Sequence, residues 1–122
     1  MIQRKQLEPR RNCETFNFKW EDIERWYAVT VGFYPDNTIG EVFISLAKSG
    51  EALEAVARDG AVTISIALQY GATIETLTNA LTRDDKNKPS SLIGAVLDEI
   101  KKRYYTHEVT HKTLSTDSVE SS

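Results

Sequence analysis

The spacing of apolar residues changes once along this chain, from every second residue to every third or fourth, and this change limits the possible folds. Between residues 15 and 46 apolar and polar side chains alternate, which is typical of strands with one buried face. Between residues 53 and 68 the apolar side chains follow the 3.6-residue period of a helix. A run of strands followed by helices predicts an α+β domain.

Three strands are expected in the alternating region, over residues 15–20, 26–34 and 41–46. Each places its larger apolar side chains on one face: Phe16, Phe18 and Trp20, then Tyr27, Val29, Val31 and Phe33, then Val42, Ile44 and Leu46. Residues 35–40, PDNTIG, are rich in amino acids that tolerate tight turns. Short connections of this kind favour an antiparallel meander.

The first helix carries one continuous apolar stripe. Its members are Leu53, Val56, Ala57, Gly60, Ala61, Ile64, Ala67 and Leu68. Gly60 lies within the stripe, where glycine costs helix stability, so it indicates a close approach to the sheet or to another helix. Val62 and Ile66 widen the apolar surface, so we expect two partners there, the next helix and a second copy of the chain in a homodimer.

Gly71 is placed to end this helix, because glycine adopts left-handed dihedrals at low cost. Thr73 is expected to cap a second helix over residues 74–81, and a serine to cap a third over residues 90–105. The predicted fold is therefore α+β, a three-stranded antiparallel sheet packed on a long helix with two further helices.

The same patterns divide the chain into three parts. We predict a basic N-terminal arm over residues 1–11, a single α+β domain over residues 12–104 and a disordered tail over residues 105–122. A length of 122 residues suits one domain with a real core and is short for two.

Composition and charge exclude several classes of function. The net charge is −3 and the basic residues are spread out except near the N-terminus, so specific DNA binding is not expected. Cys13 is the lone cysteine, which excludes an intrachain disulfide and a cysteine-rich zinc site, and it is favoured as an ordinary strand-edge residue over a nucleophile. No stretch has the apolar length to span a bilayer and no secretory signal is visible, so we expect a cytoplasmic protein.

Two basic segments are candidate binding sites. Arg10 and Arg11, with Arg4 and Lys5, would clamp a phosphate-bearing ligand or an acidic partner surface, against the commoner alternative of a solvated arm. Residues 48–50 lie where a strand leads into a helix and would hold an anion on backbone N–H groups, against the alternative of simple helix capping by serine.

Three further polar side chains have open roles. Gln69, near the end of the long helix, is read either as a polar closure of the core or as a ligand contact. Asp36 and Glu41 can be interpreted as paired carboxylates for general acid–base chemistry. Asp36 lies in the predicted turn, however, where hydrogen bonding within the turn is the favoured role.

The segment HEVTH, residues 107–111, matches the zinc-protease motif, in which two histidines bind zinc and the glutamate activates water. Working sites hold this motif in a buried helix beside a cleft. Here it lies in a Ser/Thr-rich tail, so a solvated chain end is favoured over a zinc hydrolase using His107, Glu108 and His111. We therefore expect no metal, no cofactor and no catalytic residue.

Several segments taken together resemble one known family. They are RKQLEPRRNCETFNF, YAVTVGFYPDNTIGEVFI, KSG, ISIALQYG and SSLIGAVLDEI, in this order over about residues 4–100. The chain resembles the TSCPD domain, known as a C-terminal segment of adenosylcobalamin-dependent ribonucleotide reductases and as small free-standing bacterial proteins. The matching residues are Leu7, Pro9, Arg10, Arg11, Tyr27, Gly32, Asp36, Gly40, Glu41, Phe43, Lys48, Gly50, Ser65, Leu68, Gln69, Gly71 and Asp98. Asn37 and Thr73 depart from the family, which usually has glycine and proline at these places.

The resemblance implies a link to deoxyribonucleotide supply and DNA synthesis, but the reductase barrel and its active-site cysteines are not in this sequence. The leading hypothesis is a non-catalytic accessory module that binds a ribonucleotide reductase catalytic chain, or a nucleotide or other anion. A phage or host interaction module without a reductase link is the alternative, and a zinc hydrolase is the third reading. The candidate binding residues are Arg10, Arg11, Lys48, Ser49, Gly50 and Gln69.

Overall fold

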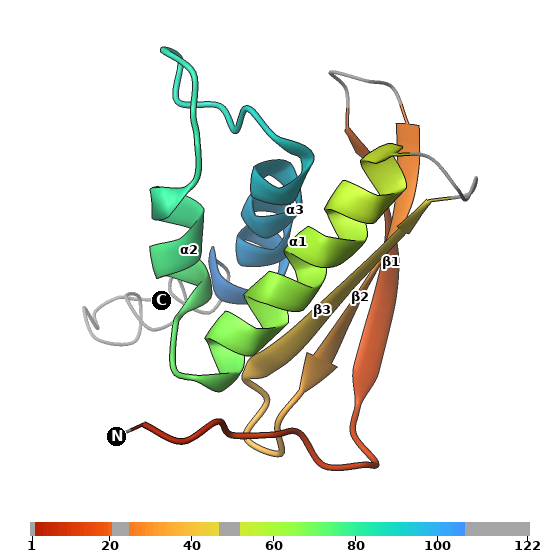
Figure 1. The fold of residues 1–122 in the computed structure, drawn as a ribbon, viewed down its shortest axis with the longest axis vertical. Coiled ribbons are helices and arrows are strands. Elements are labelled where there is room, and N and C mark those ends of the chain that lie inside the picture. Colours follow the sequence, from red (N-terminus) through yellow and green to blue (C-terminus); the bar gives the residue numbers. More distant parts are fainter. Residues whose placement is uncertain (1, 21–24, 47–51, 107–122) are drawn as a thin grey trace, which may run out of the picture.

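The computed structural model of the chain describes residues 2–20, 25–46 and 52–106, which form one antiparallel sheet with helices on one side of it (Figure 1). The strands are β1 (Cys13–Trp20), β2 (Arg25–Phe33) and β3 (Ile39–Leu46). The helices are α1 (Ala52–Gln69), α2 (Ile74–Ala80) and α3 (Leu92–Ile100), and α3 continues into a π-helical segment, η1 (Lys101–Thr106). The predicted α+β fold is confirmed.

The middle strand of the sheet is β2, and its register places like faces together. Val29 lies opposite Phe16 on β1 and opposite Ile44 on β3, so apolar residues of all three strands share the inner face. Val29 is fully buried, because the helices cover that face. The alternation therefore predicted correctly which residues face the core.

The turn between β2 and β3 is fixed by its own side chains. Tyr34 N–H donates to the Thr38 carbonyl at 2.8 Å, and Asp36 Oδ1 accepts from both the N–H and the hydroxyl of Thr38 at 3.0 and 2.6 Å. These hydrogen bonds hold the pKa of Asp36 below its ordinary value. Asn37 adopts φ 71°, which asparagine tolerates in place of glycine. The turn role predicted for Asp36 is confirmed.

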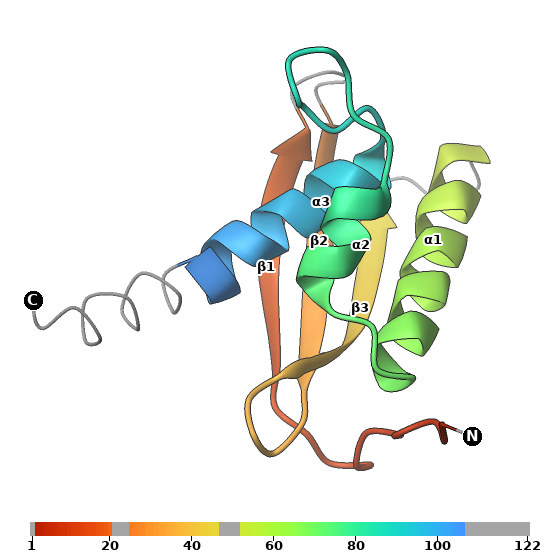
Figure 2. The ribbon, with the colours of Figure 1, turned by 90° about the vertical axis from the view of Figure 1, so that its left-hand side faces the viewer.

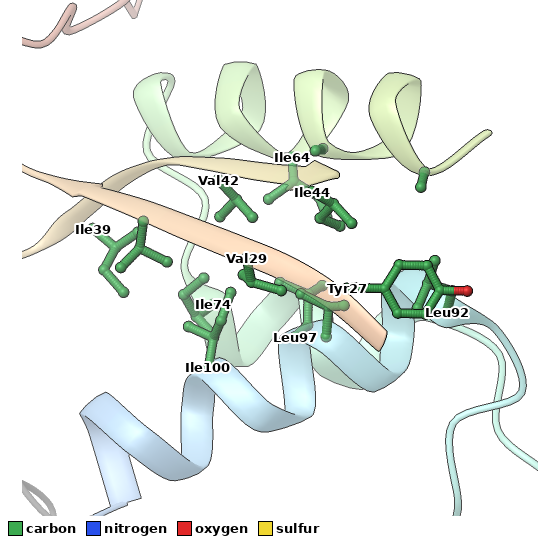
Figure 3. Close-up of a cluster of buried hydrophobic side chains, with 14 of the residues drawn as sticks. Tyr27, Val29, Ile39, Val42, Ile44, Ile64, Ile74, Leu92, Leu97 and Ile100 are labelled. Atoms are coloured by element: carbon green, nitrogen blue, oxygen red, sulfur yellow. The ribbon is translucent and has the colours of Figure 1, made fainter. Parts of the chain in front are cut away.

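Different helices cover different strands of the sheet. Figure 2 shows α3 in front of β1 and β2, with α1 running beside β3. The core between them gathers branched aliphatic side chains from both layers, including Val29, Ile44, Ile64 and Leu97 (Figure 3). One expectation is wrong: Val56 is 61% exposed, because the face of α1 that meets the core and β3 is narrower than the apolar stripe.

The end of α1 and the start of α2 lie at the residues that the sequence predicted. Gly71 has φ +106°, and its N–H donates to the Leu68 carbonyl at 3.0 Å as α1 ends. The hydroxyl of Thr73 accepts from Thr76 N–H at 3.0 Å and caps α2. An added Cβ on Gly60 would lie 2.6 Å from Ile93 Cδ1, so this glycine permits the close approach of α1 to α3.

Candidate functional site

Arg11 of the N-terminal arm is bound to a carboxylate of its own chain. Arg11 grips the carboxylate of Glu41 with its guanidinium, by Nε to Oε2 and by Nη2 to Oε1 at 3.1 Å, and it also donates from Nη1 to the Glu8 carbonyl at 2.7 Å. The hydrogen bond to Glu41 and the charge of its carboxylate raise the pKa of Arg11 above its ordinary value. Arg10 is exposed. Arg10 and Arg11 therefore differ in their contacts, because the guanidinium of Arg11 already binds the carboxylate of Glu41.

Glu41 has room for this ion pair because glycine stands opposite it in the sheet. Gly32 is its cross-strand partner on β2, and an added Cβ there would lie 2.2 Å from Glu41 Oε2. Glu41 is only 6% exposed, so its charge is stabilised by Arg11 rather than by bulk water. The sequence carried a signal for this arrangement in the glycine within an alternating strand, which often marks a close approach.

Gln69 joins three segments that are far apart in the sequence. Its Nε2 donates to the Gly40 carbonyl at 2.9 Å, and its Oε1 accepts from Arg4 Nε at 2.6 Å. Its backbone carbonyl also accepts from Lys5 N–H at 2.7 Å. Gln69 is 6% exposed, so it closes the core where the arm, β3 and α1 meet.

Ser65 lies one helical turn before Gln69 and has a related role. Its hydroxyl accepts from Val42 N–H at 2.8 Å and lies 3.1 Å from the Val42 carbonyl and 2.9 Å from the Ala61 carbonyl. Val42 and Gly40 lie on β3, the edge strand that runs beside α1. The two α1 side chains therefore satisfy backbone groups that an edge strand leaves unpaired. Sequence reasoning assigned no role to Ser65, although a serine and a glutamine four residues apart at the margin of an apolar stripe were the available signal.

Other predicted site residues lie outside the described part of the chain. These are Lys48, Ser49 and Gly50, and the HEVTH histidines with Glu108. Cys13 is exposed at the start of β1. Within residues 2–20, 25–46 and 52–106, no three His, Cys, Asp or Glu side chains gather as metal ligands. None of the helices in that part combines the length and apolar character needed to cross a bilayer.

The face of the sheet opposite the helices bears exposed apolar side chains. Phe43 on β3 is 51% exposed, and its neighbour Val42 points to the core, so Phe43 lies on the helix-free face. Val62 and Ile66 of α1 are 50% and 40% exposed. We call these three side chains, Phe43, Val62 and Ile66, the outer patch.

Helical geometry places the α1 members of the outer patch on the side of Phe43. Ser65 contacts Val42, and Gln69 contacts the earlier residue Gly40, so α1 runs antiparallel to β3. Val62 precedes Ser65 by three residues, so its side chain points about 60° away from that of Ser65 around the α1 axis. The rise of the helix over these three residues brings Val62 to the height of Phe43 along β3. The core-facing side chains of α1, such as Ile64, lie on the other side of Ser65. Phe43, Val62 and Ile66 therefore border one exposed surface.

A cavity of about 760 Å³ lies beside Gln69, which is one of its lining residues. It is lined by the N-terminal arm, the β2–β3 turn, residues 68–75 and η1. Figure 1 shows the arm, the turn and the α1–α2 connection at the same end of the molecule. Its walls are mainly apolar, and Lys5, Lys101 and Glu75 supply the charged groups. Lys5 was predicted only as part of the basic cluster of the arm, and Lys101 had no predicted binding role, because the cavity is assembled from four separate segments.

A second depression, of about 690 Å³, is more polar and lies where β1 faces α3 and the α2–α3 connection. Arg83 binds the carboxylate of Asp98 there, and it also donates to the Asn87 carbonyl at 2.9 Å. Asp98, one of the family-matching positions, thus anchors the α2–α3 connection to α3.

Most of the chain is similar in sequence to one known domain family. The TSCPD domain matches residues 3–104. The vitamin B12-dependent ribonucleotide reductase of Rhodopirellula baltica is 30% identical over 104 residues, which cover 80% of this chain and 10% of the reductase. The enzymes of the same name from Agrobacterium fabrum and Streptomyces clavuligerus are 41% and 35% identical over 51 and 54 residues, covering 42% and 44% of this chain and 4% and 6% of theirs. The chain thus spans about a tenth or less of these relatives, and no solved structure matches it significantly.

Proposed function

This chain belongs to the TSCPD domain family, and from that premise we propose that it is a non-catalytic accessory module that docks on a ribonucleotide reductase chain. Its relatives carry the matching segment within a much longer vitamin B12-dependent reductase, where segment and enzyme are covalently joined. The proposed contribution of this chain to deoxyribonucleotide supply is binding to a reductase chain of the kind in which its relatives carry the matching segment.

The observation that carries this proposal is the outer patch. Phe43 is an exposed aromatic residue on a sheet face without helices, and Val62 and Ile66 are exposed on the neighbouring helix α1. Contiguous exposed apolar side chains of this kind mark interaction surfaces on soluble domains. A buried aromatic anchor is the usual centre of a protein interface.

The arm supplies a polar rim for the same surface. Glu41 lies two residues before Phe43 on β3, Arg11 reaches it from the arm, and Arg10, next to Arg11 in the chain, is exposed. Charged groups at a rim steer association and add little to affinity. Arg10 is therefore proposed to contact an acidic patch of the partner, and a free nucleotide is the less favoured ligand because Arg11 is engaged by Glu41.

The test uses purified chain and the Rhodopirellula baltica reductase, intact and with its matching segment deleted, in a biolayer interferometry assay. We expect the chain to bind the deleted enzyme and to bind the intact one more weakly, because the resident segment occupies the docking surface. Phe43→Ser should weaken binding about tenfold or more, the usual loss at an interface hot spot.

Val62→Ser and Val56→Ser form a matched pair on the same helix, at 50% and 61% exposure. Val56 lies nine residues from Ser65, and therefore on the opposite side of α1 from β3. Only Val62→Ser should weaken binding. Equal effects of the two changes, or no binding to either enzyme form, would refute the proposal and favour an interaction module without a reductase link.

A further inference from the structure

The cavity beneath the N-terminal arm has the dimensions of a small-molecule site and lies apart from the outer patch. We propose that it binds a small molecule with an apolar body and one anionic group, such as an aryl or acyl carboxylate. Its volume of about 760 Å³ falls within the range of ligand pockets, about 300–1,000 Å³. The inference does not depend on the reductase link.

The walls of the cavity favour an apolar ligand body. Leu68 and Ile74 line its inner side, Ile2 closes it from the arm, and the Tyr34 ring stands at the β2–β3 turn. Leu68 and Ile74 are 7% and 4% exposed, so this wall is continuous with the core and does not depend on mobile surface groups. Apolar walls with few polar groups are typical of sites that bury most of a ligand.

The charged groups of the cavity favour a single negative charge on the ligand. Lys5 and Lys101 are cationic and Glu75 is anionic, which leaves the lining with one excess positive charge. Among the ion pairs of the described residues, none involves Lys5 or Lys101. A nucleoside triphosphate would bring several charges to a mainly apolar wall, whereas one carboxylate or sulfonate matches the excess charge.

The arm holds Lys5 in place before any ligand arrives. Lys5 N–H donates to the Gln69 carbonyl at 2.7 Å, and the Tyr34 hydroxyl donates to the Lys5 carbonyl. The Lys5 ammonium lies 4.5 Å from the centre of the Tyr34 ring. Fixing the backbone on both sides of a charged residue lowers the entropy lost on binding.

The test compares two fluorescent probes with the same ring systems. One is 8-anilinonaphthalene-1-sulfonate, and the other is N-phenyl-1-naphthylamine, which lacks the sulfonate. We expect both to bind at one site per chain. Lys5→Met combined with Lys101→Met should weaken binding of the sulfonate probe by about three- to tenfold, as expected for two partly exposed charges, and should leave the neutral probe unchanged.

Lys102→Met is the matched control, because it removes the same charge from η1 at a residue that does not line this cavity. Ala72→Phe should fill the cavity and abolish binding of both probes. Gln3→Trp gives a second obstruction on the exposed arm, away from the core, and near-ultraviolet circular dichroism checks that each variant is folded. Phe43→Ser should retain probe binding, which separates this site from the outer patch.

A second experiment tests whether the anionic ligand is a free acid or a lipid headgroup. Displacement of the sulfonate probe by 1-naphthoate or decanoate, without co-sedimentation of the chain on phosphatidylglycerol vesicles, supports a free acid. The proposal is overturned if Lys102→Met weakens the sulfonate probe as much as the double change. It is also overturned if folded Ala72→Phe and Gln3→Trp both bind normally, or if the chain binds vesicles and neither acid.

Discussion

Removing the Ser65 hydroxyl should reveal how much the α1 contact with the edge of the sheet stabilises the domain. In Ser65→Ala, Val42 N–H loses the acceptor that now lies 2.8 Å away, on a residue that is only 1% exposed. A buried donor left without a partner costs about 1–3 kcal/mol. Alanine is a better helix former than serine by about 0.5 kcal/mol.

The expected net loss is therefore about 0.5–2.5 kcal/mol in the free energy of unfolding. For a folded domain of roughly 100 residues, each kcal/mol lowers Tm by about 4–8 °C, so Tm should fall by about 2–20 °C. Urea denaturation followed by circular dichroism measures the free energy, and amide hydrogen exchange of Val42 reports on the edge itself.

Thr63→Ala is the matched control on the same helix. The Thr63 hydroxyl donates to the Asp59 carbonyl at 2.9 Å, within α1 and exposed to solvent, so its removal leaves no buried group without a partner. This variant should be as stable as the parent or slightly more stable. If Ser65→Ala and Thr63→Ala are equally stable, or if Val42 exchange is unchanged in Ser65→Ala, the argument for edge capping by α1 is wrong.

Three other perturbations have expected outcomes in the same unfolding assay. Gly32→Ala should destabilise the domain by about 1–3 kcal/mol through overpacking, because Glu41 occupies the space of the new methyl group, and adding Glu41→Ala should cost less than the sum of the single changes. Gly71→Ala should cost about 1–2 kcal/mol, because its φ of +106° is left-handed, and Gly71→Asn should cost less; equal stability of the three forms would contradict this. Burial and the hydrogen bond to Glu14 raise the pKa of Tyr104 to about 12 from an ordinary value of 10.0. Because the folded-state pKa is the higher one, the stabilisation is full below about pH 10 and is lost as pH rises towards 12, and Tyr104→Phe should flatten that decline.

The strand faces and helix ends of this protein could be predicted because their causes are local. Val29 and Val31 alternate with smaller or polar neighbours, and this alternation is sufficient to place them in the core. Gly71 and Thr73 act on the backbone within a few residues of themselves. Asn37 fills a position where the family usually has glycine, and it keeps the same left-handed turn.

The candidate site could be predicted only in part, because its contacts join distant segments. Gln69 was left open between a core closure and a ligand contact: its bonds to Gly40 and Arg4 show that it closes the core, and because it also lines the cavity, the ligand contact stays a prediction. The pairing of Arg11 with Glu41 depends on where the arm crosses the end of the sheet, which no local pattern specifies.

The sequence by itself determined the α+β class, the face of each strand and the ends of the helices, because hydrophobic period and backbone preference act over a few residues. The tertiary structure alone decided which polar side chains are engaged and which are available. Ser65 and Gln69 cap β3, and Lys5 and Lys101 are brought to one cavity from opposite ends of the chain. The physical reason is that a hydrogen bond or a cavity wall depends on distances in space, which are set only when the helices dock on the sheet.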